Sequence, residues 1–222
     1  MAMTVKGQCL LRIEDIDQSR SRLSWEQQIY DDLHWLGLDW SKPVVRQSAR
    51  LNRYGEGLDQ LTDMGLTYPC GCRRSDIELA AGAPQEGVAQ FGPDGRIYPG
   101  TCRDRSMSTV KSTDVIRLDM DKATALLNNP LAAFHETGPA FAGEHTLDPV
   151  SLTRAVGDII LVRRGMGASY HLSVVVDDAD QDITHLIRGE DLFEATQIHV
   201  LLQSLLDLPT PIYNHHHLIR DE

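Results

Sequence analysis

The sequence predicts an α/β fold with an insertion in its middle. Short apolar runs at residues 8–13 and 158–162 have the length and composition of buried strands. Segments with apolar residues at helical spacing, such as 24–36 and 51–64, alternate with these runs. This alternation is typical of an α/β core. A Gly- and Pro-rich stretch at residues 82–100 interrupts it with loop chemistry.

The first part of the core is expected over residues 1–65. Its apolar run predicts a strand that ends in an acidic cluster at residues 14–17. Two amphipathic helices are expected to follow. Gly37 and Gly65 stand where helix C-caps belong, so each is expected to end one of these helices.

Residues 66–150 are predicted to form the insertion. A short strand or extended segment is expected at 66–69, and an edge strand at 114–120. Asn-Asn-Pro and Gly-Pro breakers within residues 127–148 indicate irregular structure there.

The last part of the core is expected over residues 151–222. Apolar runs predict strands at 158–162, 170–176 and 183–187. A helix with an apolar face is then expected over 191–208, where a Leu-Pro pair ends it.

The composition limits which cellular compartment and which classes of partner we expect for this chain. The 222 residues are 41% hydrophobic and 24% charged, as in an ordinary globular chain, which we expect to be a monomer. The net charge of −11 argues against non-specific wrapping of nucleic acid but allows a local basic face. No stretch approaches the roughly 18 apolar residues of a membrane-spanning helix. Four cysteines in a chain this long are not a disulfide framework, which favours the reducing cytoplasm.

Three cysteines are spaced like metal ligands. Cys70 and Cys72 flank one glycine, and Cys102 follows the Gly/Pro-rich stretch. Thiolates on a tight turn can converge on zinc, which prefers four nitrogen or sulfur ligands in a tetrahedron. The fourth ligand is missing from this set, although Tyr98 lies nearby, so three reduced thiols remain the alternative. Cys9, in the first strand, is expected to be an ordinary core residue.

Three residues are candidates for binding a charged ligand. Glu14 follows a predicted strand, where a carboxylate would hold an amino group, a ribose hydroxyl or Mg²⁺, or would only pair with a neighbouring arginine. Arg188 also follows a predicted strand and suits a carboxylate or phosphate, with a salt bridge to Glu190 or Asp191 as the alternative. Tyr170 opens a predicted strand, and plain packing is its alternative role.

Three collinear segments resemble the class I glutamyl-tRNA synthetases. Residues 11–17 resemble that family's R-I-E-D-x-D signature, and residues 170–178 its Y-x-L-x-x-V-V-D-D segment. Residues 183–191 resemble the I-T-H-V-I-R-G-E segment that follows. The resemblance implies a Rossmann-like nucleotide-binding fold with a zinc-containing insertion.

Within this family, the cysteine spacing is similar to that of the glutamyl-Q tRNA(Asp) synthetases. These paralogues keep the catalytic domain and lack the anticodon-binding domain. Their pattern of C-x-C followed by Y-x-x-x-C implies a structural zinc held by Cys70, Cys72, Tyr98 and Cys102. The resemblance also implies activation of glutamate, with ATP and Mg²⁺ as co-substrates, and its transfer to the queuosine base of tRNA(Asp).

The resemblance further implies roles for the three candidate residues. Glu14 would hold the α-ammonium group of glutamate, while Tyr170 and Arg188 would line the glutamate pocket. These roles are chemically reasonable, because a carboxylate accepts hydrogen bonds from an ammonium group and an arginine guanidinium binds a carboxylate.

The two ATP-handling motifs of the family are absent. The HIGH-type motif should precede residue 11 and the KMSKS-type motif should follow residue 217, so the catalytic residues stay unknown. We therefore expect the chain as written not to form glutamyl-adenylate at a useful rate. Two alternatives stay open: a fragment of an ordinary glutamyl-tRNA synthetase, and a non-catalytic tRNA-binding paralogue.

Overall fold

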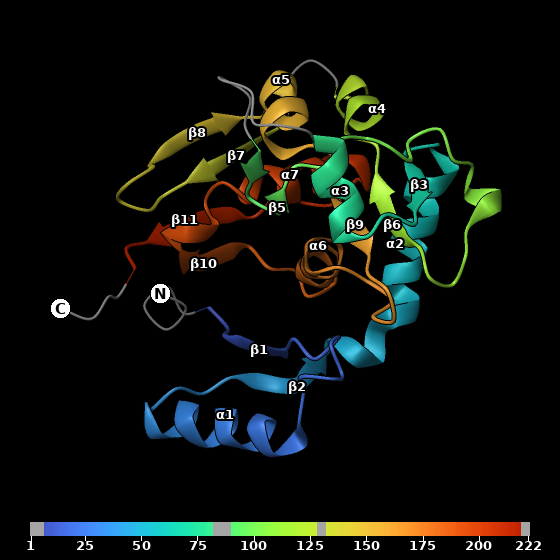
Figure 1. Ribbon diagram of the computed structural model, residues 1–222. Helices are drawn as coiled ribbons and strands as arrows, with labels where there is room; N and C mark the ends of the chain where they lie inside the picture. The colour runs from blue at the N-terminus through green and yellow to red at the C-terminus, as the bar shows by residue number, and fades with distance from the viewer. Residues whose placement is uncertain (1–6, 82–89, 128–131, 219–222) are drawn as a thin grey trace.

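The computed structural model describes residues 7–81, 90–127 and 132–218. Helices and strands are mixed along the chain, so the predicted α/β class is confirmed. Figure 1 shows a main body and a smaller unit beside it, built from the first part of the chain.

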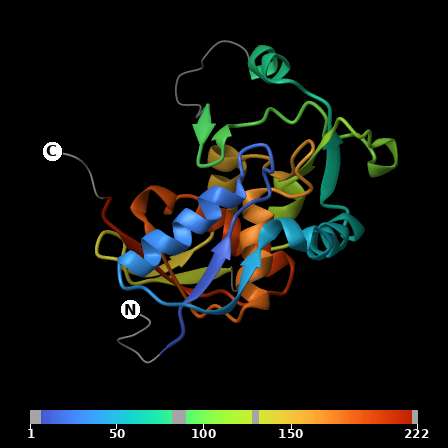
Figure 2. The same ribbon diagram turned by 90° about the horizontal axis from the view of Figure 1, so that it is seen from below.

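The smaller unit contains β1 (Leu10–Ile13), α1 (Leu23–Trp35) and β2 (Ser41–Arg46). The two strands are parallel and pair with each other. Figure 2 shows α1 lying across this strand pair. The helix buries little apolar surface: Leu23 and Trp35 are more than 80% exposed, and the expected apolar face at Ile29 and Leu36 is also exposed.

A four-stranded sheet forms one side of the main body. Its order is β10 (His185–Gly189), β11 (Ile212–His216), β7 (Ala133–Glu136) and β8 (Gly143–Thr146). The first three strands are parallel to one another, and β8 is antiparallel to β7. Residues 127–148 were expected to be irregular. Residues 128–131 lie outside the described part of the chain, and over 132–148 the expectation is wrong because β7 and β8 form a regular hairpin.

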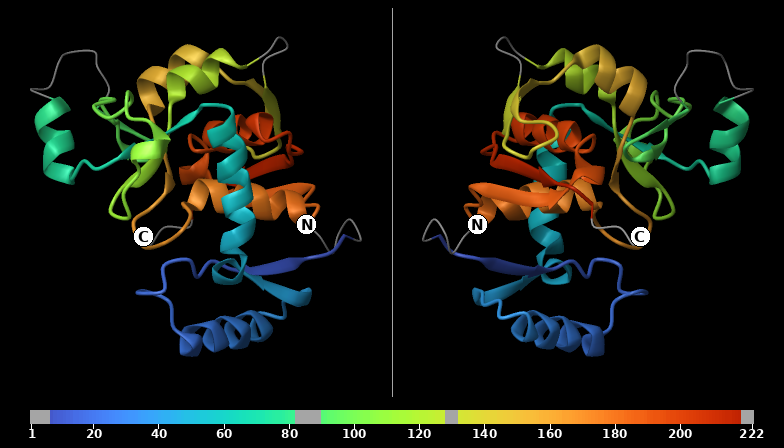
Figure 3. Two further views of the ribbon diagram at one scale, coloured as in Figure 1. Left: turned by 90° about the vertical axis from the view of Figure 1, so that its right-hand side faces the viewer. Right: turned by 90° about the vertical axis from the view of Figure 1, so that its left-hand side faces the viewer.

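A second, antiparallel sheet has the order β3 (Thr67–Cys70), β6 (Val115–Leu118) and β9 (Ile160–Val162). The strand predicted at 114–120 exists, but it is central rather than at the edge. Beyond β3 lie α3 (Arg74–Ala81) and a two-residue hairpin formed by β4 (Phe91–Gly92) and β5 (Gly95–Arg96). Figure 3 shows α3 projecting from the side of the body.

The core lies between the two sheets and the helices that pack against them. The long helices are α2 (Leu51–Asp63), α6 (Tyr170–Asp180) and α7 (Thr196–Leu205). The short ones are α4 (Met120–Ala125) and α5 (Pro149–Ser151), and α5 continues as a π-helix over Leu152–Val156. Fully buried core residues come from most of these elements: Tyr54, Leu61, Leu118, Leu161, Leu172, Leu201 and Tyr213.

The strand predicted at residues 170–176 is wrong, because this segment is the central helix α6. Ser169 caps the helix by accepting a hydrogen bond from the Leu172 backbone N–H. Every residue from His171 to Asp178 is buried, so the helix has no polar face and its sequence lacks helical periodicity. A continuous apolar run of this length reads equally well as a buried strand.

Buried carboxylates at the end of α6 join the smaller unit to the body. Asp177 accepts hydrogen bonds from Gln47 at 3.0 Å, Arg50 at 2.7 Å and the Tyr54 hydroxyl at 2.9 Å. Arg12 of β1 donates to Asp178 at 2.6 Å. These bonds tie β1 and the start of α2 to the C-terminal end of α6.

Candidate functional site

Arg188 lies in β10 and is a buried cation with neutral hydrogen-bond partners. Its side chain donates to His215 Nε2 at 2.9 Å, to His199 Nδ1 at 3.0 Å and to the Thr196 hydroxyl at 2.6 Å. Within the described part of the chain, no carboxylate lies within 4.0 Å of the guanidinium, so the alternative salt bridge is not formed. A buried positive charge without a counter-ion is costly unless a ligand supplies the anion.

The backbone beside Arg188 passes close to its neighbours. A Cβ atom added at Gly189 would lie 2.4 Å from a carboxylate oxygen of Asp191, which is the end of a flexible side chain that can move aside. The short helix Glu190–Leu192 follows directly. Gly189 has an ordinary φ of −70°, so the chain passes from β10 into this helix without needing the conformational freedom of glycine.

Tyr170 stands at the first position of α6 and not at a strand end, which corrects the expectation. Its phenol is influenced by both of the other candidate residues. Burial raises the pKa of the Tyr170 phenol, and the negative charge of Glu14 raises it further. The positive charge of Arg188 acts in the opposite direction. Glu14 and Arg188 therefore each lie within electrostatic reach of Tyr170.

Glu14 follows β1, and its half-exposed carboxylate lies 3.4 Å from Arg12. A pocket of about 380 Å³ opens beside it, between the loop after β1 and α1. Tyr170 and Arg188 are not among the lining residues of this pocket. Glu14 therefore lines a pocket that the other two candidate residues do not line.

The neighbouring carboxylates have structural partners. Asp15 accepts hydrogen bonds from the backbone and hydroxyl of Ser48, at 2.9 and 2.6 Å. Asp17 accepts from Ser19, which holds the turn after β1. These two carboxylates therefore order the loop through Ser48 and Ser19.

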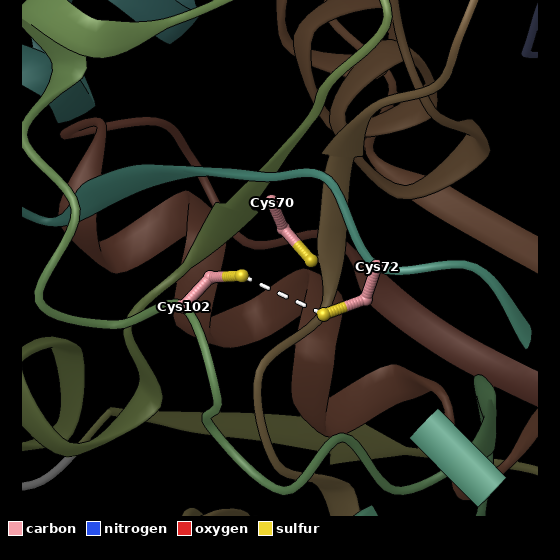
Figure 4. A group of neighbouring side chains, drawn as sticks. All are labelled: Cys70, Cys72 and Cys102. Carbon is pink, nitrogen blue, oxygen red and sulfur yellow. Dashed lines mark hydrogen bonds between the residues drawn. The ribbon is translucent and has the colours of Figure 1, made fainter. Parts of the chain in front are cut away.

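The three cysteines converge, as Figure 4 shows. Their sulfur atoms all lie within 4.8 Å of one another, and Cys72 Sγ lies 3.5 Å from Cys102 Sγ. The Tyr98 hydroxyl lies 3.2 Å from Cys70 Sγ and 3.4 Å from Cys72 Sγ. The backbone N–H of Cys102 donates to the same hydroxyl at 3.0 Å. Cys9 is exposed, so its expected place in the core is wrong.

The thiols of this cluster differ in acidity. Burial is the main reason why the pKa of the Cys72 thiol is raised to about 11. Burial also acts to raise the pKa of the Cys102 thiol, but hydrogen bonds with Tyr98 and Cys72 outweigh it and leave that pKa below its usual range. The Arg117 guanidinium stacks on the Tyr98 ring, 3.9 Å from its centroid.

A large pocket of about 760 Å³ lies beside the cysteine cluster and is rich in arginine. Its two carboxylates, Asp94 and Asp158, are outnumbered by its cations. The arginines come from the start of α3 and the residue before it, from β5 and β6, and from the segment after β9: Arg73, Arg74, Arg96, Arg117, Arg163 and Arg164. The acidic composition of the chain still allowed a local basic face, and the arginines that line this pocket form such a face.

Sequence reasoning missed the partners of the candidate residues. His199 and His215 hold Arg188, and Asp178 holds Arg12 beside Glu14. Their positions carry no local signal, because they meet only when α6, α7, β10 and β11 pack together. His215 stands in a run of three histidines, and it is buried while the two that follow are exposed.

The whole chain matches one family model and several named relatives. The model of the catalytic domain of class I tRNA synthetases (E and Q) covers residues 1–222. The glutamyl-Q tRNA(Asp) synthetase of Rhodobacter capsulatus is 54% identical, over 100% of this chain and 79% of that protein. The protein of the same name from Albidiferax ferrireducens is 38% identical, over 96% of this chain and 71% of that protein.

Solved structures show the same fold. The glutamate-tRNA synthetase of Elizabethkingia anophelis superposes with a TM-score of 0.72 at 23% identity, covering 97% of this chain. This chain spans 44% of the length of that structure. In the ranges that the structure describes, each helix is too short or too polar to cross a bilayer. The chain therefore belongs to the class I tRNA synthetases (E and Q) and, within them, to the glutamyl-Q tRNA(Asp) synthetases.

Proposed function

We propose that this chain binds glutamate for ATP-dependent activation and for transfer to the queuosine base of tRNA(Asp). The observation that carries the proposal is the buried Arg188 guanidinium, whose hydrogen-bond partners are all neutral. Such a cation favours an anionic ligand, and a carboxylate matches its planar fork. The names of the relatives support glutamate as the source of that carboxylate.

The three candidate residues divide the groups of the amino acid among them. Arg188 binds a carboxylate, Glu14 holds the α-ammonium group, and the Tyr170 hydroxyl orients the substrate as a hydrogen-bond donor. The influence of both Glu14 and Arg188 on the Tyr170 phenol supports one shared site. A pocket built from polar partners rejects substrates that lack the matching groups.

ATP and Mg²⁺ are the co-substrates of this reaction, as in class I synthetases generally. Activation of an amino acid is largely a matter of positioning and of stabilising charge on the phosphates. The part assigned to this chain's described residues is binding and orientation of the amino acid.

A structural zinc bound by Cys70, Cys72, Tyr98 and Cys102 is part of the proposal. In a tetrahedral centre with Zn–S bonds of about 2.3 Å, the ligand atoms lie roughly 3.5–3.8 Å apart. The sulfur–sulfur distance of 3.5 Å and the sulfur–oxygen distances of 3.2 and 3.4 Å fit this arrangement. Arg117 beside Tyr98 would offset the negative charge of the ligands.

Bound zinc would cross-link the end of β3 to the turn at residues 98–102. This link supports the proposed division of the chain into a core over residues 1–65 and 151–222 and a zinc-binding insertion over 66–150. The few apolar residues that pack around the cluster supply little stability on their own.

The arginine-rich pocket is the proposed contact with tRNA. Arginine is the usual partner of phosphate oxygens in complexes with nucleic acid. The rest of the chain is acidic, with a net charge of −11, so RNA would be directed to this face.

The function is tested by measuring incorporation of radiolabelled L-glutamate into tRNA, with this chain beside a version extended at both ends to carry the two ATP-handling motifs, because the chain as written is expected not to form glutamyl-adenylate. The substrates are tRNA(Asp) with queuosine, tRNA(Asp) without it, and tRNA(Glu), each lacking its terminal adenosine so that the 3′ end cannot be charged. Label in the first tRNA alone supports the proposal. Calorimetry with L-glutamate, and with L-aspartate and L-glutamine as controls, tests the pocket separately. Absence of L-glutamate binding contradicts the proposal.

A further inference from the structure

A row of buried hydrogen bonds runs through Arg188 and fixes its surroundings. On one side, Arg188 Nε donates to His215 Nε2 at 2.9 Å, and His215 Nδ1 lies 2.5 Å from Glu136 Oε2. Both His215 and Glu136 are at most 1% exposed. Since a guanidinium only donates, His215 Nε2 must accept and the ring proton must sit on Nδ1, facing Glu136.

On the other side of Arg188, the row of hydrogen bonds continues through two histidines, and the donor at each step is fixed in the same way. Arg188 Nη1 lies 3.0 Å from His199 Nδ1, so that nitrogen must accept. The His199 proton then sits on Nε2 and is donated to His171 Nδ1 at 3.0 Å. His171 in turn donates from Nε2 to Asp94 at 3.2 Å. The direction of each bond follows from the one donor, Arg188.

Arg188 keeps its full charge and part of its donor capacity in this arrangement. A guanidinium carries about five N–H donors, and their directions are fixed by its planar geometry. His215, His199 and Thr196 take one each. One N–H therefore remains on each terminal nitrogen, where a carboxylate can accept from it. An acidic side chain in place of a histidine would satisfy the same donor but neutralise the charge.

We propose that His199 and His215 are positioning residues that hold Arg188 for the carboxylate of the amino-acid substrate. They act as neutral acceptors, and Asp94 and Glu136 set their tautomers from the outer ends of the row. The proposal rests on the proposed function, because it takes the substrate carboxylate as the ligand of Arg188.

Burial and charge keep the two rings neutral. Burial lowers the pKa of His199 well below its usual value, and the charge of Arg188 lowers it further. Burial also lowers the pKa of His215, although the hydrogen bond with Glu136 opposes this. Both histidines can therefore accept from Arg188 at neutral pH.

Paired substitutions separate positioning from packing. His199 accepts through Nδ1, so His199→Asn keeps an acceptor at that position and His199→Gln does not. His215 accepts through Nε2, so the order is reversed: His215→Gln keeps the acceptor and His215→Asn does not. We expect the acceptor-keeping variants to bind L-glutamate within about threefold of wild type, and the others to bind at least about tenfold more weakly. His185, exposed on the same strand, is the control, and His185→Asn should change nothing.

A purely packing role predicts a different order. Glutamine is closer to histidine in size than asparagine, so packing would rank the Gln variant first at both positions. That ranking in the calorimetric titrations would overturn the proposal.

Nitrogen NMR of the wild-type chain tests the same inference without any substitution. We expect both rings to be neutral at pH 7, with the proton of His215 on Nδ1 and that of His199 on Nε2. A charged ring or the opposite tautomer at either position would overturn the positioning role. The expected tautomers in a chain that binds no L-glutamate would instead contradict the proposed function and the ligand assigned to Arg188.

Discussion

At the scale of single residues, Arg188 is the clearest candidate for recognition. Its guanidinium satisfies three acceptors at once, on β11 and α7. A lysine would keep the charge but cannot donate in three fixed directions within one plane. We expect Arg188→Lys to weaken L-glutamate binding at least about tenfold, since charge-assisted hydrogen bonds contribute roughly 1.5–3 kcal/mol each.

Isothermal titration calorimetry measures this loss. Arg74→Lys is the matched control, because the Arg74 side chain is 90% exposed and, among the described residues, pairs only with Glu78 on its own helix. Unchanged affinity in Arg188→Lys would mean that a point charge suffices, and the fork geometry would lose its role.

At the scale of elements, the contact between α1 and β2 depends on one buried carboxylate. Glu26 accepts from the Tyr30 hydroxyl at 2.5 Å and forms a salt bridge with Arg46. The hydrogen bond from Arg46, followed by that from Tyr30, lowers the pKa of Glu26. A carboxyl group whose pKa is lowered by folding stabilises the folded state above the unfolded pKa, and this stability disappears as the pH falls through the folded pKa.

Acid should therefore loosen α1 before it unfolds the body. The unfolded pKa of a glutamate is about 4.3, so the change is expected below about pH 4. All three tryptophans, Trp25, Trp35 and Trp40, lie in or beside α1, so intrinsic fluorescence reports on this unit. In Glu26→Gln the fluorescence should no longer change in this range, whereas Glu78→Gln on α3 should behave as wild type. An equal acid response in Glu26→Gln would assign the effect to another group.

The insertion is the second element that depends on a few residues. We expect purified protein to contain about one zinc ion per chain, because the four proposed ligands form one tetrahedral site. Removal of the metal by a chelator should speed amide hydrogen exchange at residues 70–72 and 98–102, because the ion links these segments. Cys72→Ser should lose the zinc, and Cys9→Ser, at an exposed cysteine, should keep it.

Elemental analysis and hydrogen-exchange mass spectrometry measure these effects. A zinc content near zero in the wild-type chain, unaffected by Cys72→Ser, would favour the reduced-thiol interpretation.

At the scale of the whole molecule, charge is unevenly distributed. The chain is acidic overall, yet one pocket collects six arginines. We expect Arg163→Gln to weaken binding of tRNA(Asp) several-fold and to reduce the slope of log K against log salt by about 0.9 per lost phosphate contact. The loss should be the same with and without queuosine, since backbone contacts carry no base information.

Filter binding across a series of salt concentrations measures that slope. Lys122→Gln removes the same charge outside the pocket and should leave the slope unchanged. Equal losses in the two variants would indicate a general effect of net charge rather than a contact surface.

The sequence predicted local features well where the pattern was self-contained. The helix at 51–64 is confirmed as α2, and Gly65 ends it with a φ of +74°, a conformation that glycine adopts at no steric cost. The strand at 66–69 is confirmed as β3. The prediction for 170–176 failed because α6 is buried on all sides, so the period that distinguishes helix from strand is missing.

The sequence by itself determined the family, the α/β class and the identity of the side chains that carry charge and sulfur. These follow from residue types at short spacing, which the chain carries without any packing. Only the tertiary structure decided that Arg188 is held by neutral histidines, that three cysteines and Tyr98 meet, and that α6 is a helix. The physical reason is that hydrogen bonds and burial between distant segments arise when elements pack, and no local pattern records which neighbour will be there.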